Sequence, residues 1–67
     1  MRKIIKNYNE NSETVFNFNT LICTVYIDST KYLTKKFNCL DDLQNAFNVN
    51  IERCEKRHFQ YCTINEN

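Results

Sequence analysis

The sequence predicts a small α+β domain, with an antiparallel sheet of four or five strands and one α-helix packed on one face. Short stretches rich in β-branched and aromatic residues recur between clusters of Asn, Asp and Ser, which is typical of strands joined by turns. One stretch, at about residues 39–48 or longer, places apolar residues three and four positions apart, as an amphipathic helix requires. The chain of 67 residues has the length of one small domain, so we expect residues 1–67 to fold as a single unit.

Two strands are expected in the N-terminal part of the chain. Residues 2–8 form the first and residues 13–18 form the second, and the polar run 9–12 between them predicts a turn. A single straight strand over 13–27 would be about 50 Å long, which is too long for this domain. We therefore expect a bend or turn near 17–20.

A β-hairpin is predicted over 20–37, where two β-branched and aromatic runs flank the turn residues 28–30. A two-residue loop would separate the apolar side chains of the two strands onto opposite faces. A three-residue loop pairs Val25 with Leu33 and gathers the apolar side chains on one face, so we prefer this register. Such a loop usually needs a residue with positive φ. Because the chain has no glycine, a longer or less regular loop stays open.

The preferred register gives the hairpin an apolar inner face and a mixed outer face. A slip of one residue would exchange the two faces, because side chains alternate along a strand. The inner face is predicted to carry Leu21, Cys23, Val25, Ile27, Leu33 and Phe37. The outer face is predicted to carry Ile22, Thr24, Tyr26, Tyr32, Thr34 and Lys36, with Tyr26 opposite Tyr32.

The helix is expected to begin at Asn38, since Asn is a favoured N-cap residue. Two carboxylates in the first turn, Asp41 and Asp42, complement the helix dipole. We expect the apolar stripe of the helix to cover the inner face of the hairpin. That stripe consists of Leu40, Leu43 and Phe47.

The C-terminal third allows two interpretations, and we favour the one in which the helix stops near Asn48. The run Asn-Val-Asn that begins there is a poor helix centre by intrinsic propensity. Residues 51–54 and 59–64 then form a pair of strands, and residues 65–67 fray.

In the other interpretation the helix continues to about His58. Its support is that Ile51 and Cys54 extend the apolar stripe at helical spacing. Residues 59–64 form a strand in this interpretation as well.

Composition and charge limit the classes of function. Nine basic residues stand against eight acidic ones, which argues against nucleic-acid binding driven mainly by bulk electrostatics. No signal-peptide or membrane-spanning run is visible, so we expect no membrane association and a cytoplasmic protein, in the host cell if it is viral. Asn, Lys, Ile, Tyr and Phe, which all have AT-rich codons, make up 32 of the 67 residues and indicate an AT-rich genome.

No catalytic, cofactor-binding or metal-binding residues are predicted. No phosphate-binding loop, zinc-protease helix or nucleophile elbow is present, so we do not expect an enzyme. Cys54, His58 and Cys62, four residues apart, would share one face of a continuous helix, and Cys39 or Cys23 could complete a zinc site. We favour four reduced cysteines that act as small apolar residues over zinc binding or disulfides.

Two surfaces are candidates for binding a partner. The first is the outer face of the hairpin, with Ile22, Tyr26, Tyr32 and Lys36, because uncovered Tyr side chains are enriched at protein interfaces. The alternative for this face is that the N-terminal strands or the C-terminal segment fold over it. The second is a basic patch for nucleic acid, with Lys35, Arg53 and Arg57 near aromatic residues.

These observations favour a non-enzymatic protein-binding module. Small size, AT-rich coding and the lack of catalytic groups make the chain look like a small phage or mobile-element inhibitor of a host defence complex, such as an anti-CRISPR protein. This is an analogy of size and composition. The alternatives are a small RNA- or DNA-binding module, or a structural subunit of a homo-oligomer such as a homodimer.

Overall fold

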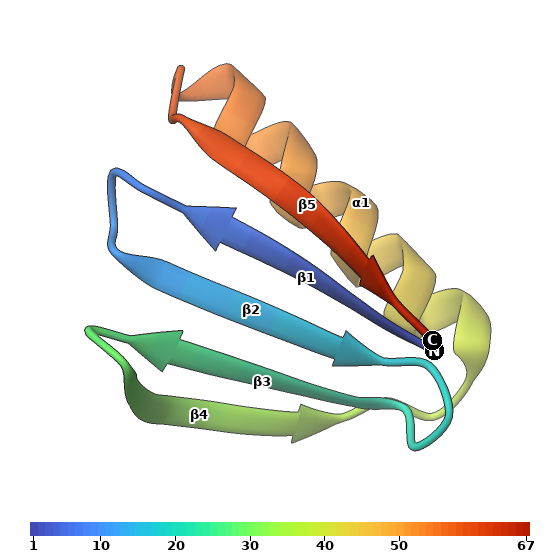
Figure 1. The fold of residues 1–67 in the computed structure, drawn as a ribbon. Coiled ribbons are helices and arrows are strands. Elements are labelled where there is room, and N and C mark those ends of the chain that lie inside the picture. Colours follow the sequence, from blue (N-terminus) through green and yellow to red (C-terminus); the bar gives the residue numbers. More distant parts are fainter.

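Five strands and one helix make up the fold in the computed structural model, which describes residues 1–67 (Figure 1). Their order is β1 (Arg2–Asn7), β2 (Ser12–Asn17), β3 (Ile22–Ile27), β4 (Thr30–Lys36), α1 (Leu40–Lys56) and β5 (Tyr61–Glu66). All strands belong to one open sheet of order β4-β3-β2-β1-β5, and every neighbouring pair is antiparallel. The helix packs on one face of this sheet, so the predicted α+β fold is confirmed.

The first two hairpin loops, residues 8–11 and 18–21, are built in the same way. In the first, Asn7 Oδ1 accepts hydrogen bonds from the backbone N–H groups of the residues two and three positions later, at 3.0 and 3.1 Å. In the second, Asn17 Oδ1 does the same at 2.9 and 3.1 Å. Each loop ends in a residue with positive φ, Asn11 at 49° and Leu21 at 62°. Asn side chains therefore hold these turns in a chain without glycine.

The β3–β4 hairpin combines a two-residue turn with a β-bulge. Asp28 and Ser29 both have positive φ, 52° and 64°, which is the geometry of a turn whose twist matches the strands. The register then shifts between Val25 and Tyr26. As a result Val25 pairs with Leu33, as predicted, and the pairing continues in this register to the end of the hairpin.

The predicted three-residue loop is wrong near the turn. The extra residue lies in β4 instead of the loop, where Lys31 and Tyr32 both face Tyr26. Tyr26 is paired with Lys31 and not with Tyr32. A two-residue turn with two positive φ angles is the favoured hairpin connection, and the bulge absorbs the difference in length.

Helix α1 continues to Lys56, so the interpretation that we favoured from the sequence, with a strand at 51–54, is wrong. β4 and β5 lie at opposite edges of the sheet and run in the same direction, so the chain must return along the sheet between them. A helix of 17 residues spans about 26 Å, and one that ended near Asn48 would span about 14 Å. The burial of Cys54 and the partial burial of Ile51 offset the weak helix propensity of the Asn-Val-Asn run.

The helix begins one residue later than predicted. Its N-cap is Cys39 and not Asn38, and no side chain caps the free N–H groups. Asp41 and Asp42 occupy the first turn, as expected, and they complement the positive end of the helix dipole.

The helix ends in a Schellman motif without glycine. The His58 N–H donates to the carbonyl oxygen of Glu55 at 3.2 Å, and the Phe59 N–H donates to that of Cys54 at 2.9 Å. His58 takes the left-handed conformation that this motif needs, with φ of 56°. The chain then turns toward the sheet and enters β5.

Strand β5 pairs with β1 over its whole length, from Tyr61 opposite Asn7 to Glu66 opposite Arg2. The strand therefore lies two residues later than predicted, and the expected fraying of residues 65–67 is wrong for the first two of them. An ion pair of 2.7 Å between Arg2 and Glu66 closes this end of the pair.

The core lies between α1 and the middle of the sheet. It consists of Ile5, Phe16, Cys23, Leu43, Phe47 and Cys54. The rings of Phe16 and Phe47 meet edge to face with centroids 5.3 Å apart. Leu40, which we expected in the apolar stripe, is 53% exposed, so the stripe runs from Leu43 to Cys54. The molecule contains no helix both long enough and apolar enough to cross a membrane.

Candidate protein-binding surface

The sheet face opposite α1, called the open face below, has no element packed on it. β1, β2 and β5 lie beside the hairpin in the same sheet and do not fold over it (Figure 1). The alternative in which terminal segments cover the outer face of the hairpin is therefore wrong. Side chains on this face are covered only by their neighbours in the sheet, as the buried Ile4 is, and those without such cover meet solvent unless a partner binds.

Three of the four residues predicted to bind a protein partner share the open face. Ile22 and Lys36 are a cross-strand pair, and Tyr26 lies on the same side of β3, four residues after Ile22. Tyr32 is the extra residue of the bulge beside Tyr26. Tyr32 is 67% exposed and Tyr26 is 36% exposed, while Ile22 is half-buried among its neighbours.

The middle of the open face carries an aliphatic row that sequence reasoning missed. Ile64, Ile4, Val15 and Thr24 are successive cross-strand neighbours on β5, β1, β2 and β3. Val15 and the buried Ile4 form the apolar floor of a shallow depression of about 420 Å³, whose other lining residues are polar except for Tyr26. Finding this row requires the register of four strands relative to one another, which the spacing of residues within any one strand does not show.

The tip of the hairpin is also uncovered on the side that faces the helix. The core contacts the base of the hairpin through Leu21, Cys23 and Phe37, but Val25, Ile27 and Leu33 do not pack against it. Leu33 is 45% exposed, and every residue of β4 is exposed. The prediction that α1 covers the whole inner face is therefore wrong, because the core beneath α1 ends at Cys23 on the hairpin and does not reach its tip.

The three residues proposed as a nucleic-acid patch lie on two elements. Lys35 is on β4, opposite Cys23, with its Nζ 4.9 Å from the centre of the Phe37 ring. Arg53 and Arg57 lie in the last turn of α1 and at its C-cap. Arg53 is already paired with the Glu10 carboxylate, which lowers its capacity to bind a phosphate.

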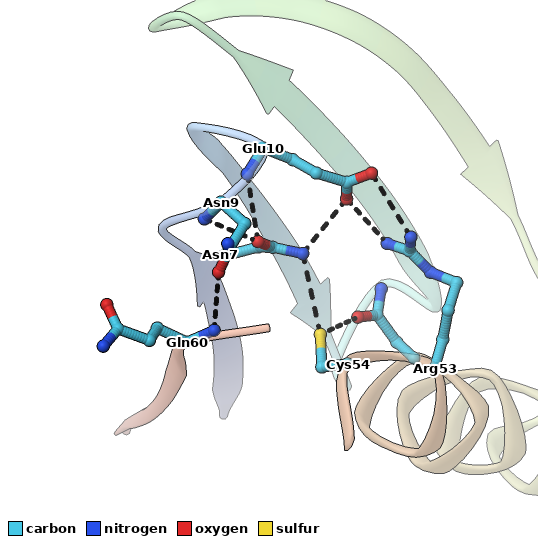
Figure 2. Close-up of polar contacts among 7 residues, drawn as sticks. Asn7, Asn9, Glu10, Arg53, Cys54 and Gln60 are labelled. Atoms are coloured by element: carbon cyan, nitrogen blue, oxygen red, sulfur yellow. Dashed lines mark hydrogen bonds and ion pairs between the residues drawn. The ribbon is translucent and has the colours of Figure 1, made fainter. Parts of the chain in front are cut away.

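That partner belongs to a polar network around Asn7, which joins the first hairpin loop to α1 (Figure 2). The Asn7 side-chain amide donates to Glu10 Oε1 at 3.0 Å and contacts Cys54 Sγ at 3.7 Å. Arg53 donates to both carboxylate oxygens of Glu10, at 3.0 and 3.4 Å, and these bonds raise the pKa of Arg53. The guanidinium carbon Cζ of Arg53 also lies 5.9 Å from the centre of the Phe59 ring.

The same network holds the segment that enters β5. Asn9 Oδ1 accepts a hydrogen bond from the Gln60 backbone N–H at 2.6 Å, and the Tyr8 N–H donates to the Gln60 carbonyl oxygen at 2.9 Å. Asn7 is buried, and its polar atoms have partners within the molecule. The network therefore has a structural role, since it fixes the loop, the helix end and β5 relative to one another.

The cysteines and the histidine are dispersed. Cys54 is buried beneath Asn7, His58 is exposed in the helix-ending turn, and Cys62 lies on the open face, where its Sγ is 3.2 Å from the Tyr8 hydroxyl. All four cysteines are free, and no three His, Cys, Asp or Glu side chains lie close enough together to hold a metal ion. Burial raises the pKa of the Cys54 and Cys23 thiols, so both stay protonated at neutral pH.

Comparison with family models, with curated proteins and with solved structures finds no match to this chain. The function is therefore inferred from the surface itself.

Proposed function

We propose that this protein is a non-enzymatic protein-binding module that docks on its partner through the β3–β4 hairpin. The observation that supports the proposal is that this hairpin is left without cover at its tip on both faces and along one edge. Three of the seven large hydrophobic side chains that are exposed belong to it: Tyr26, Tyr32 and Leu33.

The chemistry of the hairpin suits a protein interface. Tyr combines a large, stiff apolar ring with a hydroxyl that bonds to polar groups, and it is enriched among the residues that dominate binding energy. Ile22, Thr24 and the aliphatic floor beside Tyr26 give the open face an apolar centre, and Lys36 lies at its rim.

The form of this function that composition favours is inhibition of a host defence complex by a phage or mobile-element protein of the anti-CRISPR type, acting in the host cytoplasm. A domain of 67 residues inhibits such a complex by occupying a surface that the complex needs. The analogy of size and AT-rich composition is its support, and the binding proposal does not depend on it.

The test is capture of a partner by the tagged protein from a nuclease-treated lysate of a low-GC bacterium, compared with two variants. The variant Tyr26→Ala/Tyr32→Ala removes both rings of the hairpin. The variant Leu40→Ala is the control, because Leu40 is 53% exposed but lies at the start of α1, on the other side of the sheet from the open face. We expect wild type and the Leu40 variant to capture the same protein, and the double variant to lose it while keeping its melting temperature.

Three results would count against the proposal. Capture that survives in the double variant would show that the hairpin is not the interface. Recovery that disappears on nuclease treatment would favour a nucleic-acid-binding module instead. A molecular mass in solution that rises to that of a dimer as the protein concentration increases would favour a homodimer in which the Tyr face pairs with itself, provided that the double variant stays a monomer.

A further inference from the structure

The outer edge of β4 has free main-chain hydrogen-bonding groups. On the inner side, the Phe37 N–H donates to the carbonyl oxygen of Leu21 on the β3 side at 2.8 Å. Backbone groups alternate along an antiparallel strand, so those of Thr34 and Lys36 point away from β3. Because every residue of β4 is exposed, nothing in the molecule covers this edge. An uncovered edge of this kind accepts a further strand.

The edge strand is basic, and its charges have no acidic partner in the molecule. Lys31, Lys35 and Lys36 are the only charged residues of β4. The two ion pairs of the protein join Arg2 to Glu66 and Arg53 to Glu10, and neither involves these lysines.

A second copy of the chain fits this edge poorly. Pairing β4 with the β4 of a second copy would bring together two strands that each carry three lysines and no acidic residue. Like charges directly opposite one another destabilise a strand pair, whereas opposite charges stabilise it. The lysines therefore select a partner strand with carboxylates and reject self-pairing.

We propose that β4 accepts an extended acidic segment of the partner protein as an additional antiparallel strand of the sheet. The inference rests on the proposed function and names the chemistry of the partner. The segment carries carboxylates opposite Lys31, Lys35 and Lys36, and an apolar residue opposite Leu33, which has Val25 beside it on the same face. Such a strand adds side chains next to Lys36 on the open face of the sheet and next to Leu33 on the face that carries the helix.

The probe that tests this inference is the synthetic peptide Glu-Glu-Thr-Val-Glu-Thr-Thr, which matches β4 in length. It places its first two glutamates opposite Lys36 and Lys35, and its third opposite the bulge on the face that carries Lys31. It is titrated into the isotope-labelled full chain and followed by NMR. We expect the largest amide shifts at Thr34 and Lys36. We expect binding at least about tenfold weaker for the peptide with Lys in place of each Glu, because attractive pairs become repulsive. A peptide with N-methylated amides keeps the charges but cannot form the ladder, and it should not bind.

Two variants separate local pairing from net charge. Lys35→Gln/Lys36→Gln is expected to weaken binding of the acidic peptide by about five- to tenfold, since it removes two cross-strand pairs. Lys56→Gln/Arg57→Gln removes the same charge from α1 and is expected to change the affinity by less than about twofold.

The inference is overturned if the acidic peptide does not bind, if its shifts centre on the open face around Tyr26, or if the N-methylated peptide binds equally well. Dimer formation by Lys35→Gln/Lys36→Gln would also overturn it, because the lysines would then only guard the edge against self-pairing. The capture experiment decides the proposed function separately. A partner that the Tyr variant loses, together with undisturbed edge amides, keeps the binding module and rejects the added strand.

Discussion

Replacing Asn7 and Asn17 by Ala should destabilise the protein to clearly different extents, although both residues build the same kind of loop. Each side-chain oxygen accepts two backbone hydrogen bonds of similar length. Asn17 does no more than this and is half-buried, so water can take over its bonds. A hydrogen bond of this kind contributes about 0.5–1.5 kcal/mol, so Asn17→Ala should cost about 1 kcal/mol.

Asn7 has a second role, and its loss should cost more. It is buried, and its side-chain amide also bonds the Glu10 carboxylate and contacts Cys54 of α1. A hydrogen bond to a charged group contributes about 1.5–3 kcal/mol, and removing Asn7 also takes away its contact with the buried Cys54 thiol. We therefore expect Asn7→Ala to cost about 3 kcal/mol, which is a large part of the stability of a domain of this size.

The assay is urea denaturation followed by circular dichroism, since the chain has no Trp. Equal costs for the two variants, within about 0.5 kcal/mol, would refute the role of Asn7 in joining the loop to the helix. If Asn7→Ala does not fold, Glu10→Gln supplies the milder test. Glu10 is about half-exposed, so weakening its pair with Arg53 should cost less than about 1 kcal/mol. A cost well above that would show that the Glu10 carboxylate stabilises the folded protein more than an exposed ion pair does.

Three further predictions concern the turn, the helix stripe and pH. Ser29→Gly should raise the free energy of unfolding by up to about 1 kcal/mol, because Ser29 has a φ of 64° that glycine adopts without strain; a loss in urea denaturation would contradict the turn geometry. Leu43→Ala should cost about 2–5 kcal/mol and Leu40→Ala less than about 1 kcal/mol, since only Leu43 is buried; similar costs would place Leu40 in the core. Burial raises the pKa of the Cys23 and Cys54 thiols, so the folded state holds these protons more tightly than the unfolded state. Stability should therefore be complete below the ordinary thiol pKa of about 8.5 and fall as the pH rises above it. Cys23→Ala should show a smaller fall in denaturation curves at increasing pH, and an unchanged slope would argue against its burial.

The sequence was a good guide to features that depend on neighbouring residues. The first four strands, the turn near 17–20 and the pairing of Val25 with Leu33 follow from alternation and from turn residues, and the structure confirms them. The first loop was predicted from its run of polar residues, and the second was predicted as a bend or turn. The hydrogen-bonding pattern that the two loops share went unpredicted, although the similar residues 7–10 (NYNE) and 17–20 (NFNT) carry the signal.

Features that depend on distant parts of the chain were predicted less well. The length of α1 is set by the need to return along the sheet from β4 to β5, and this outweighs the local propensity of the Asn-Val-Asn run. How far α1 reaches across the sheet depends on which strands form the edges. For that reason the sequence placed Val25 and Leu33 under the helix, whereas in the structure neither packs against the core, Leu33 is exposed and Val25 is half-buried.

The candidate surface shows the same division. Alternation along the hairpin placed Ile22, Tyr26 and Lys36 together on one face, and the strand register agrees. The hairpin alone does not determine whether that face is covered, because its exposure depends on β1, β2 and β5 extending the sheet sideways. The proposed basic patch divides between β4 and the end of α1, since spacing along the chain does not report the distance between a strand and a helix.

The central claim is that the tip of the β3–β4 hairpin, with Tyr26 and Tyr32, is a surface for a protein partner and not part of the core. The most direct measurement compares wild type with Tyr26→Ala/Tyr32→Ala for both partner capture and melting temperature. We predict that capture is lost while the melting temperature changes by no more than a few degrees, since both rings are exposed. Retained capture, or a melting temperature that falls as for a buried aromatic residue, would contradict this claim.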